Sequence, residues 1–518
     1  MGKELIVTAM SRMRNVLEYL EQSAERFPEK SAVTDGICTY TYKELLAYSR
    51  KIGSGIAAYC RSEQPVAVLA EKGADTLAAF LGIIQAGCFY VLMNPELPIG
   101  RLEQVQQVLQ AAYIVTDREH REMALQIVPE HQILWMEELM ETDENQTLLS
   151  ERRKRAIDTA PLYANFTSGS TGQPKGVVVS HRSVLDFIDV FTELFGITSE
   201  DRIANQAPFD FDVSVKDIYS SLKTGATLVI VPKQLFSQPA PLLDYLCDHE
   251  VTVMIWAVSA LCLISIFHGL DYKVPAKVRK VLFSGEVMPP KHLKAWMDHL
   301  PEADFINLYG PTEITCNCTY HRIDRNRDYS EGVPVGKAFP NEHVFLLDEQ
   351  DHEITEPDKA GEICVRGTAL ALGYYRMPEQ TAEHFVQNPL NHCYPELIYR
   401  TGDLGRYNEY GEILFGGRKD YQIKYMGHRI ELEEIERAME NIEGISRACC
   451  IFDEKKSKLY GFYVGEIEKK ELHHRMSSSL PPFMVPGALR KVEQMPLTKN
   501  GKTDRKALME KHAKGARA

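Results

Sequence analysis

The sequence alternates short apolar segments, rich in β-branched and aromatic residues, with longer stretches whose apolar residues recur at helical spacing. The short segments read PVAVLA, CFYVLM, AAYIVT, ATLVIVP, VTVMIW, KVLFSGE and DFINLYG. Strands that helices cover on both faces of a parallel sheet have this near-continuous apolar character. The alternation therefore predicts an α/β protein built on helix-covered parallel sheet.

Three stretches have boundaries that can be predicted. NVLEYLEQSAERFPEKSAV keeps helical spacing as far as Pro28, and TYKELLAYSRKIGSGIAAYC repeats the pattern after a threonine in a capping position. The longest apolar run, residues 253–267, has 15 residues. That is fewer than the roughly 20 residues that span a bilayer, so we interpret it as a buried strand that continues into a helix.

The texture of the sequence changes at residue 334. Shorter segments rich in Gly, Pro and Asp follow, which are typical of antiparallel hairpins and predict a barrel-like subdomain over about 334–419. Beyond it, the order strand, helix, strand and a proline-bearing loop predicts a separate small unit. We therefore expect two domains, 1–419 and 420–518, with the boundary at Asp420.

Composition and charge restrict the class of function. A chain of 518 residues is too long for one ordinary core, and 59 basic against 72 acidic residues give a net charge of −13. This charge disfavours nucleic-acid or anionic-membrane partners. The N-terminus lacks the apolar core of a signal peptide, and the 11 cysteines show no metal-ligand spacing. We expect a cytoplasmic protein with reduced thiols and no membrane insertion.

The strongest candidate binding segment is NFTSGSTGQPKGVVVSH, residues 165–181. Its central ten residues hold three glycines, four hydroxyl side chains and Lys175. Glycines let N–H groups converge, hydroxyls add donors and lysine adds charge, so the loop suits a phosphate better than a purely structural turn. A Walker loop needs glycine at the sixth position counted from its first glycine, and here that position is Pro174 when Gly169 is counted first or Val177 when Gly172 is. A kinase or GTPase loop is therefore not indicated.

TSGSTGQPKG resembles the phosphate loop of the adenylate-forming superfamily, which includes acyl-CoA synthetases, luciferases and the adenylation domains of nonribosomal peptide synthetases. Further motifs appear along the chain in the order typical of that family, the first two before the loop and the others after it: YTYKELL, QAGCFYVLMNPELP, FDVSVKDIY, NLYGPTE, GEICVRGTALALGYY, YRTGDLGRYNEYGEILFGGRKDYQIKYMGHRIELEEIE and PLTKNGKTDRKAL. The resemblance covers almost the whole chain. It implies a large N-terminal domain of two helix-covered sheets with the barrel-like subdomain, and a small mobile α+β C-terminal domain.

Members of this family join a carboxylate to the α-phosphate of ATP, release pyrophosphate and pass the acyl group to a thiol. Two anions meet in the first step, so the protein must supply cations and fixed dipoles rather than a strong base. The implied cofactors are ATP and Mg²⁺. By resemblance, Lys502 reaches the acyl carboxylate, Thr312 reaches the α-phosphate and Glu313 is the Mg²⁺ ligand; these are the expected catalytic residues.

The resemblance also implies a nucleotide site. Tyr309 is expected to pack against adenine, and Asp403 to accept hydrogen bonds from the ribose hydroxyls beside Arg418. The full expected set of ATP-binding residues is Thr167, Ser168, Gly169, Ser170, Thr171, Gly172, Lys175, Asn307, Leu308, Tyr309, Gly310, Pro311, Asp403, Phe415 and Arg418.

A movement between the two half-reactions is implied as well. Asp420 lies where the family has its hinge, and a small polar residue there tolerates the change in backbone angles. Lys424 and Gly427 would face the thiol tunnel in the second orientation.

QAPFDFDVSVKDIYSSL resembles the amino-acid-activating members, in which the aspartate of the motif pairs with the substrate ammonium. Here that residue is Asp212, and a buried carboxylate needs a cationic partner, which favours an amino acid over a fatty or aryl acid. The alternative is that Asp212 caps a helix. The expected substrate pocket is Asp212, Val213, Lys216, Ile255, Leu282, Ser284, Leu308, Cys316 and Asn317.

Lys216 is the unusual residue of that pocket. If it points inward, a substrate with a carboxylate or another acceptor is favoured. If it extends to solvent, a small and mildly polar pocket remains. The sequence leaves both alternatives open.

The chain holds neither a carrier-domain LGGxS motif nor a condensation HHxxxDG motif, so we expect a free-standing enzyme. FDVSVKDIY and LFSGEVMPP also resemble the ligases that charge a carrier protein with D-alanine. The implied partners are an amino acid and a phosphopantetheinylated carrier protein acting in trans. Two other hypotheses are an acyl- or aryl-CoA ligase of the same superfamily and a non-catalytic ligand-binding relative.

Overall fold

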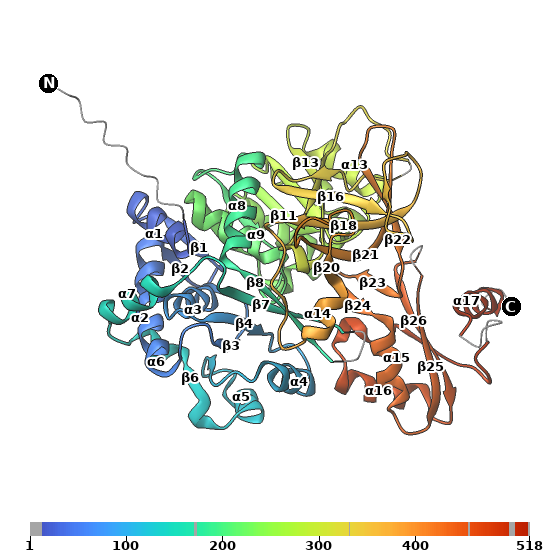
Figure 1. The fold of residues 1–518 in the computed structure, drawn as a ribbon, viewed down its shortest axis with the longest axis horizontal. Helices are drawn as coiled ribbons and strands as arrows, with labels where there is room; N and C mark the ends of the chain where they lie inside the picture. Colours follow the sequence, from blue (N-terminus) through green and yellow to red (C-terminus); the bar gives the residue numbers. More distant parts are fainter. Residues whose placement is uncertain (1–12, 170–172, 331, 454–455, 497–502, 516–518) are drawn as a thin grey trace.

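In this computed structural model the described residues are 13–169, 173–330, 332–453, 456–496 and 503–515. They form two large sheets covered by helices, whose strands are interleaved along the chain, then a smaller antiparallel sheet and a C-terminal unit, drawn in orange to red in Figure 1. The predicted α/β class with a large N-terminal and a small C-terminal part is confirmed.

The first large sheet is parallel in its centre and antiparallel at its edges. Its order is β15-β14-β13-β12-β11-β9-β10-β1-β2. The strands are β1 (Ser31–Thr34), β2 (Thr39–Thr41), β9 (Arg202–Asn205), β10 (Thr227–Ile230), β11 (Val253–Ala257), β12 (Lys280–Ser284), β13 (Asp304–Tyr309), β14 (Thr319–Arg322) and β15 (Lys337–Ala338). Four segments predicted to be strands form β10, β11, β12 and β13 of its parallel centre, whereas β1 and β9 in the same centre were not predicted.

The second large sheet carries the glycine-rich loop. Its order is β19-β8-β7-β4-β3-β5-β6. The strands are β3 (Pro65–Leu69), β4 (Phe89–Met93), β5 (Ile114–Thr116), β6 (Ile133–Trp135), β7 (Pro161–Thr167), β8 (Lys175–Ser180) and β19 (Gly373–Tyr374). Because β7 and β8 are antiparallel neighbours, the loop between them projects from one end of the sheet.

Helices and short 3-10 turns connect and cover these sheets. They are α1 (Leu17–Arg26), α2 (Tyr42–Tyr59), α3 (Ala74–Gln85), α4 (Ile99–Leu109), α5 (Arg121–Ile127), η1 (Glu130–Gln132), α6 (Met136–Met140), α7 (Gln146–Arg155), α8 (His181–Phe195), α9 (Val213–Thr224), η2 (Lys233–Ser237), α10 (Pro239–Asp248), α11 (Val258–Ile266), α12 (Gly269–Tyr272), α13 (Pro290–His299) and η3 (Thr312–Ile314). The predicted cap of α2 is confirmed, since Thr41 and Glu44 form a reciprocal capping box.

One apolar core joins the two large sheets through α8 and α9. It includes Tyr163 of the second sheet, Leu282 of the first sheet and Ile218 of α9, all buried. Tyr90 on β4 and Tyr219 on α9 share a hydrogen bond of 3.1 Å between their hydroxyls. Helix α9 is therefore held rigidly between the sheets, which matters because it carries two residues of the expected pocket.

The antiparallel sheet follows, as the change of texture after residue 334 predicts. Its strands are β16 (Glu342–Leu347), β17 (Glu353–Ile354), β18 (Gly361–Gly367), β20 (Phe385–Gln387), β21 (Leu397–Tyr407) and β22 (Ile413–Arg418), with α14 (Pro378–His384) before β20. Neighbouring strands pair antiparallel throughout.

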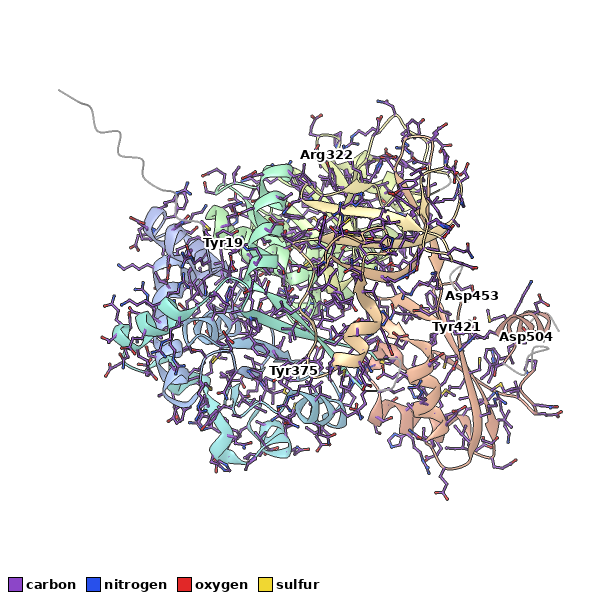
Figure 2. All side chains as sticks on the ribbon, viewed as in Figure 1. Tyr19, Arg322, Tyr375, Tyr421, Asp453 and Asp504 are labelled. Atoms are coloured by element: carbon purple, nitrogen blue, oxygen red, sulfur yellow. The ribbon has the colours of Figure 1, made fainter. Side chains whose placement is uncertain are left out.

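The C-terminal unit begins with a hairpin that points back toward the large sheets. Its elements are β23 (Gln422–Tyr425), β24 (His428–Glu431), α15 (Leu432–Glu440), β25 (Ile445–Asp453), β26 (Lys458–Gly465), α16 (Lys469–Ser479), η4 (Pro482–Met484), β27 (Ala488–Lys491) and α17 (Arg505–Gly515). Helix α17 lies at the outer edge of the molecule (Figure 1). Arg505 holds it there by contacting Glu436 and lying over the Tyr421 ring at 4.0 Å, and Figure 2 shows Tyr421 and Asp504 on that side.

The apolar run 253–267 is β11 followed directly by α11, as predicted. Among the residues that the structure describes, no helix combines the length and the apolar character needed to cross a bilayer.

Candidate active site

The glycine-rich loop begins where β7 ends. Gly169 has no room for a side chain, because a Cβ atom there would lie 2.1 Å from the carbonyl oxygen of Gln173. The Thr167 hydroxyl is buried and has no hydrogen-bond partner among the described residues. Lys175 is buried at the start of β8, with its ammonium 5.0 Å from the centre of the Tyr374 ring. The three loop residues 170–172, all expected to bind ATP, lie outside the described residues.

Glu313, the expected Mg²⁺ ligand, is fully buried on η3. Its carboxylate accepts hydrogen bonds from the Tyr374 hydroxyl at 2.8 Å and from Arg429 Nη1 at 2.7 Å. Burial alone acts to raise the pKa of this carboxyl, but Arg429 and Lys175 outweigh it and lower the pKa to about 2. The group is therefore ionised at neutral pH, as a ligand for a hard cation must be.

The residues expected to hold adenine and ribose lie together. The Tyr309 hydroxyl donates to Asp403 Oδ2 at 2.5 Å, and Arg418 contacts the other carboxylate oxygen of Asp403 from the paired position on β22. Burial and then Asp403 raise the pKa of Tyr309. Arg418 also makes two bonds to Asp420, of 2.6 and 2.8 Å, and Lys424 Nζ lies 5.4 Å from the centre of the Tyr309 ring.

Two other expected nucleotide residues take less direct positions. Phe415 is partly exposed, with its ring centre 6.5 Å from that of Tyr309. Asn307 is buried on β13, and its side chain donates to the carbonyl of Pro334 at 2.8 Å. Its amide therefore ties two segments of the N-terminal part together.

The expected substrate pocket is assembled from one sheet face, one helix and one loop. Ile255 on β11 lies opposite Leu282 on β12, and Leu282 lies opposite Ile306 on β13. Ser284 and Leu308 follow two residues later on their strands, so they share this face. Ile255, Leu282, Leu308 and Cys316 belong to one buried apolar cluster that also includes residues of α9. The structure thus brings the predicted pocket residues together.

Asp212 stands at the start of α9 but does not cap it. Its side chain makes no capping hydrogen bond with the helix, which contradicts the capping alternative. Instead it is hydrogen-bonded to the Thr312 side chain, and burial raises its pKa. Cys316 Sγ donates to the backbone carbonyl of Asp212 at 2.8 Å, which joins the two walls of the pocket.

Lys216 points inward. It is fully buried, and its Nζ donates to Asn317 Oδ1 at 2.6 Å. Burial lowers its pKa, while Cys316, Asp212 and Asp217 act in the opposite direction. The alternative that this side chain extends to solvent is therefore wrong.

The β23–β24 hairpin of the C-terminal unit reaches this site. The backbone N–H of Gly427, at its tip, donates to Glu286 Oε1 at 2.8 Å, and the His428 ring packs edge-on against Phe211 with 4.6 Å between centres. Arg429 follows and reaches Glu313, while its carbonyl accepts a 2.7 Å hydrogen bond from the Ser168 hydroxyl. The hairpin thus contacts both the metal-ligand candidate and the phosphate loop.

A second contact joins α4 to α15. Arg101 Nη1 donates to Glu434 Oε1 at 2.8 Å, and both side chains are almost completely buried. The backbone N–H of Gly169 also faces the Glu434 carboxylate. Sequence reasoning did not single out Arg429, Arg101 or Glu434. Arg429 and Glu434 lie within the conspicuous motif of residues 399–436, so their position in the sequence could have drawn attention to them. Nothing in the sequence around Arg101 indicates a role for it.

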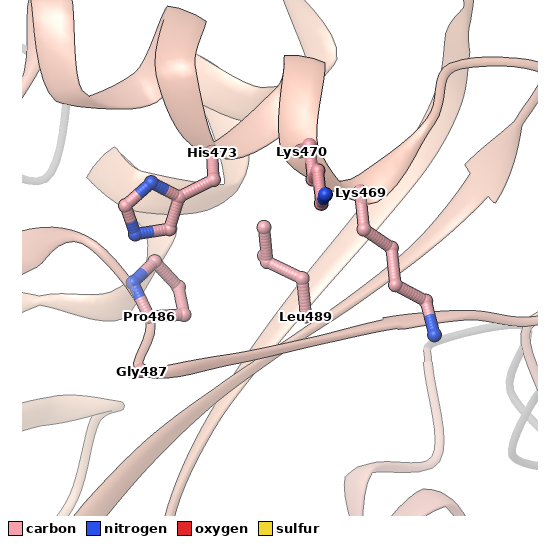
Figure 3. Close-up of a pocket in the computed structure, with 6 residues that line it drawn as sticks. All are labelled: Lys469, Lys470, His473, Pro486, Gly487 and Leu489. Atoms are coloured by element: carbon pink, nitrogen blue, oxygen red, sulfur yellow. The ribbon is translucent and has the colours of Figure 1, made fainter.

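Lys502 lies outside the described residues. Within the described ranges, no cluster of three or more His, Cys, Asp or Glu side chains is arranged to hold a metal ion. Figure 3 shows a surface pocket of about 330 Å³ in the C-terminal unit, lined by Lys469, Lys470, His473, Pro486, Gly487 and Leu489. It contains none of the expected site residues.

Comparison with known proteins agrees with this geometry. A profile of the AMP-binding enzyme family matches residues 20–375, and a profile of the AMP-binding enzyme C-terminal domain matches residues 434–502. The chain therefore belongs to the AMP-binding enzyme family, as an adenylate-forming enzyme of the adenylation-domain type.

Particular relatives can be named. The chain is 31% identical over 513 residues to surfactin synthase subunit 1 of Bacillus subtilis (strain 168), covering 97% of this chain but only 14% of that protein. The crystal structure of IdnL1 matches with a TM-score of 0.80 at 28% identity, over 94% of this chain and 98% of that one. PA1221, a nonribosomal peptide synthetase protein containing adenylation and PCP domains, shares the fold with a TM-score of 0.81 at 24% identity, over 96% and 84% of the two chains.

Proposed function

We propose that this protein activates an amino acid as an aminoacyl adenylate, with release of pyrophosphate, and transfers the aminoacyl group to the phosphopantetheine thiol of a separate carrier protein. The carrier is supported by likeness alone, since PA1221 contains both adenylation and PCP domains. The choice of an amino acid rests on a feature of this chain.

That feature is the Asp212 carboxylate. It stands at the start of α9 without capping the helix, and burial raises its pKa. A carboxylate in such a place needs a cationic partner. Lys216 and Lys424 lie within electrostatic reach of Asp212, but neither forms a close ion pair with it among the described residues, and Lys216 is hydrogen-bonded to Asn317. The α-ammonium of an amino acid would supply the missing charge, whereas a fatty or aryl acid would leave the carboxylate buried without it.

In the first half-reaction, a carboxylate oxygen of the amino acid attacks the α-phosphorus, and the bond from that phosphorus to pyrophosphate breaks. The loop that begins at Thr167, together with Lys175, would take up the charge of the departing pyrophosphate. Thr312 is hydrogen-bonded to Asp212 and directly precedes Glu313 on η3, which suits it to bridge the ammonium site and the α-phosphate. Asp403 would hold the ribose.

Mg²⁺ fits this donor set. Glu313 offers a buried, ionised carboxylate, and a nucleotide would add phosphate oxygens, a combination that Mg²⁺ prefers to a complete protein cage. When bound, the ion would neutralise charge on the phosphates.

The described orientation of the C-terminal unit supports the second half-reaction, in which the thiol sulfur attacks the acyl carbonyl and AMP leaves. Arg429 engages both Glu313 and Ser168, so the hairpin competes with Mg²⁺ and phosphate for the same groups. We propose that a rotation about Asp420 withdraws the hairpin and brings Lys502 to the acyl carboxylate.

Amino-acid-dependent ATP–pyrophosphate exchange, with both enantiomers of each candidate, tests the proposal. We expect exchange with at least one amino acid, and its loss in Asp212→Asn. Exchange with no amino acid would contradict amino-acid activation. A second assay compares CoA with a phosphopantetheinylated carrier protein as thiol acceptor, and transfer to CoA alone would favour an acyl-CoA ligase.

A further inference from the structure

The side-chain end of the proposed pocket contains a buried lysine, Lys216, whose ammonium makes no close ion pair with a carboxylate among the described residues. From this we infer that the substrate is an amino acid with a carboxylate in its side chain, bound by Lys216 and Asn317. The inference rests on the proposed function, because it concerns the same pocket.

Lys216 lies on the same face of α9 as Asp212. It follows Asp212 by four residues at the start of α9, and residues four apart share one face of a helix. A substrate whose ammonium meets Asp212 would therefore extend its side chain along the face that carries Lys216. Ile255, Leu282 and Leu308 line the opposite wall and would pack against the intervening methylene groups.

Within the part of the chain that the structure describes, the Lys216 ammonium has fewer hydrogen-bond and ion-pair partners than it can accommodate. An ammonium group has three N–H donors, and Lys216 uses one of them on Asn317 Oδ1. Among the described residues, no carboxylate oxygen lies within 4.0 Å of its Nζ, although the side chain is completely buried. A buried cation without an ion-pair partner is costly, so an acceptor is missing from this place.

The nearest acid inside the protein does not supply it. Asp217 is buried beside Lys216 and accepts a hydrogen bond from Asn205 at 2.7 Å, while its other oxygen has no partner among the described residues. Burial raises the pKa of Asp217 to about 8. The Asp217 carboxyl thus bonds Asn205 rather than Lys216, and it makes no close ion pair with the lysine among the described residues.

Two further hydrogen-bond donors, on Tyr163 and Ser220, also lack a partner in the described part of the chain. The hydroxyls of Tyr163 and Ser220 are fully buried and have no hydrogen-bond partner within the described ranges. Ser220 follows Lys216 by one further turn on α9, and Tyr163 lies within electrostatic reach of Asp212 and Cys316. A pocket built for an apolar side chain would leave all of these groups unsatisfied, whereas a carboxylate accepts several hydrogen bonds.

Charge balance gives the same answer. An acidic amino acid brings one cation and two anions: its ammonium meets Asp212, its side-chain carboxylate meets Lys216, and its α-carboxylate goes to the phosphate. A neutral amino acid would bury Lys216 unpaired in every turnover. The length of the side chain, and so the choice between aspartate, glutamate and longer homologues, is left to the experiment.

The test is ATP–pyrophosphate exchange with aspartate, glutamate, 2-aminoadipate and the matching neutral amino acids asparagine, glutamine, alanine and leucine, each in both configurations. We expect an acidic amino acid to exceed its amide by at least about tenfold in kcat/KM, since a site built around a buried polar group rejects ligands that leave it unpaired. In Lys216→Met this preference should disappear, with activation of the acid falling by about 100-fold or more and a neutral amino acid gaining.

Two further variants keep the test decisive. Lys280→Met removes another buried lysine, one already paired with Asp304 at 3.0 Å at the far end of β12, and should leave the substrate profile unchanged. Asn317→Asp places a carboxylate against Lys216, and that carboxylate should take the place of the substrate's side-chain carboxylate. We therefore expect this variant to activate acidic amino acids more slowly, a result that can be measured even if Lys216→Met fails to fold.

The outcomes separate the two proposals. If the unaltered protein activates a neutral amino acid and Lys216→Met keeps the same preference, the acidic-substrate inference is wrong while amino-acid activation stands. If the unaltered protein activates no amino acid at all, the proposed function itself fails.

Discussion

Arg429 Nη1 donates to Glu313 Oε2 at 2.7 Å, across 116 residues of sequence. One group comes from the hairpin of the C-terminal unit, and the other is the carboxylate expected to bind Mg²⁺. Both are buried, and the ion pair lowers the pKa of Glu313 to about 2 despite its burial. The Arg429 guanidinium therefore takes the place beside Glu313 that a divalent cation would occupy. The two cations would compete for the same carboxylate.

Replacing Arg429 should separate the two half-reactions. Breaking a buried ion pair costs about 3–5 kcal/mol, so Arg429→Met should depopulate the described orientation by roughly 100-fold or more. We expect thioester formation to slow far more than pyrophosphate exchange, because in the proposed mechanism only thioester formation uses this orientation. The two rates are measured by single-turnover loading of a carrier protein and by exchange. Arg437→Met is the control, since among the described residues the side chain of that arginine contacts Glu433 at 3.6 Å on the exposed surface. An equal loss of both rates in Arg429→Met would argue against this role.

The buried pair between Arg101 and Glu434 should behave as an interdomain latch. A double-mutant cycle of Arg101→Met and Glu434→Gln should give a coupling energy of about 1–3 kcal/mol, measured on the thioester-forming step. The exposed pair Arg121 and Glu130, 2.9 Å apart within the N-terminal part, serves for comparison and should couple by less than about 1 kcal/mol. Additive effects of the two buried substitutions would show that the contact contributes nothing to the orientation.

The phosphate loop should tolerate no side chain at Gly169. A methyl group there would meet the Gln173 carbonyl at 2.1 Å, so Gly169→Ala must displace the loop, and exchange should fall by roughly 100-fold. Gly100→Ala is the matched control, because no atom lies within 4 Å of a Cβ built at that position in α4. It should change the free energy of unfolding by less than about 1 kcal/mol, toward higher stability. Normal exchange in Gly169→Ala would mean that the loop does not hold phosphate.

The described orientation should weaken at acid pH. His428 packs against Phe211 of the N-terminal part and stacks on Phe483 with 3.4 Å between ring centres. Burial, and secondarily Lys233, lowers its pKa from 6.5 to about 3. The neutral ring is thus favoured while the hairpin is docked. Its contribution is complete above pH 6.5 and is lost progressively as the pH falls from there toward 3.

The measurement is the ratio of thioester formation to pyrophosphate exchange between about pH 5 and pH 8. The ratio should fall on the acid side in the unaltered protein and stay flatter in His428→Phe, which keeps the ring packing without a titratable group. An identical pH profile in both proteins would remove His428 from the explanation.

Much of the fold could be predicted because it follows from short-range patterns. The capping box at Thr41 needs only a threonine and a glutamate three residues apart, and the run 253–267 is a strand and a helix because its length suits both and spans no bilayer. Parallel strands were predicted from their uniform apolar character, which results from helices on both faces of a sheet. The members of the site followed from the order of the motifs along the chain.

Several features of the site could not be predicted from the sequence. They are the direction of Lys216, the failure of Asp212 to cap α9, and the partners of Arg429 and Arg101. Arg101 and Glu434 are 333 residues apart, and each would be read from its own neighbourhood as an ordinary helix-surface charge. A lysine has enough rotatable bonds to reach either solvent or the pocket, so its residue type does not decide the matter.

The amino-acid sequence by itself determined most of the segments that become strands and helices, and which loop gathers glycines, hydroxyls and a lysine, because backbone sterics, capping and burial act over a few neighbouring residues. Only the tertiary structure decided which charges meet. Those encounters depend on how distant elements close on one another in three dimensions, and on which buried groups are then left without a partner.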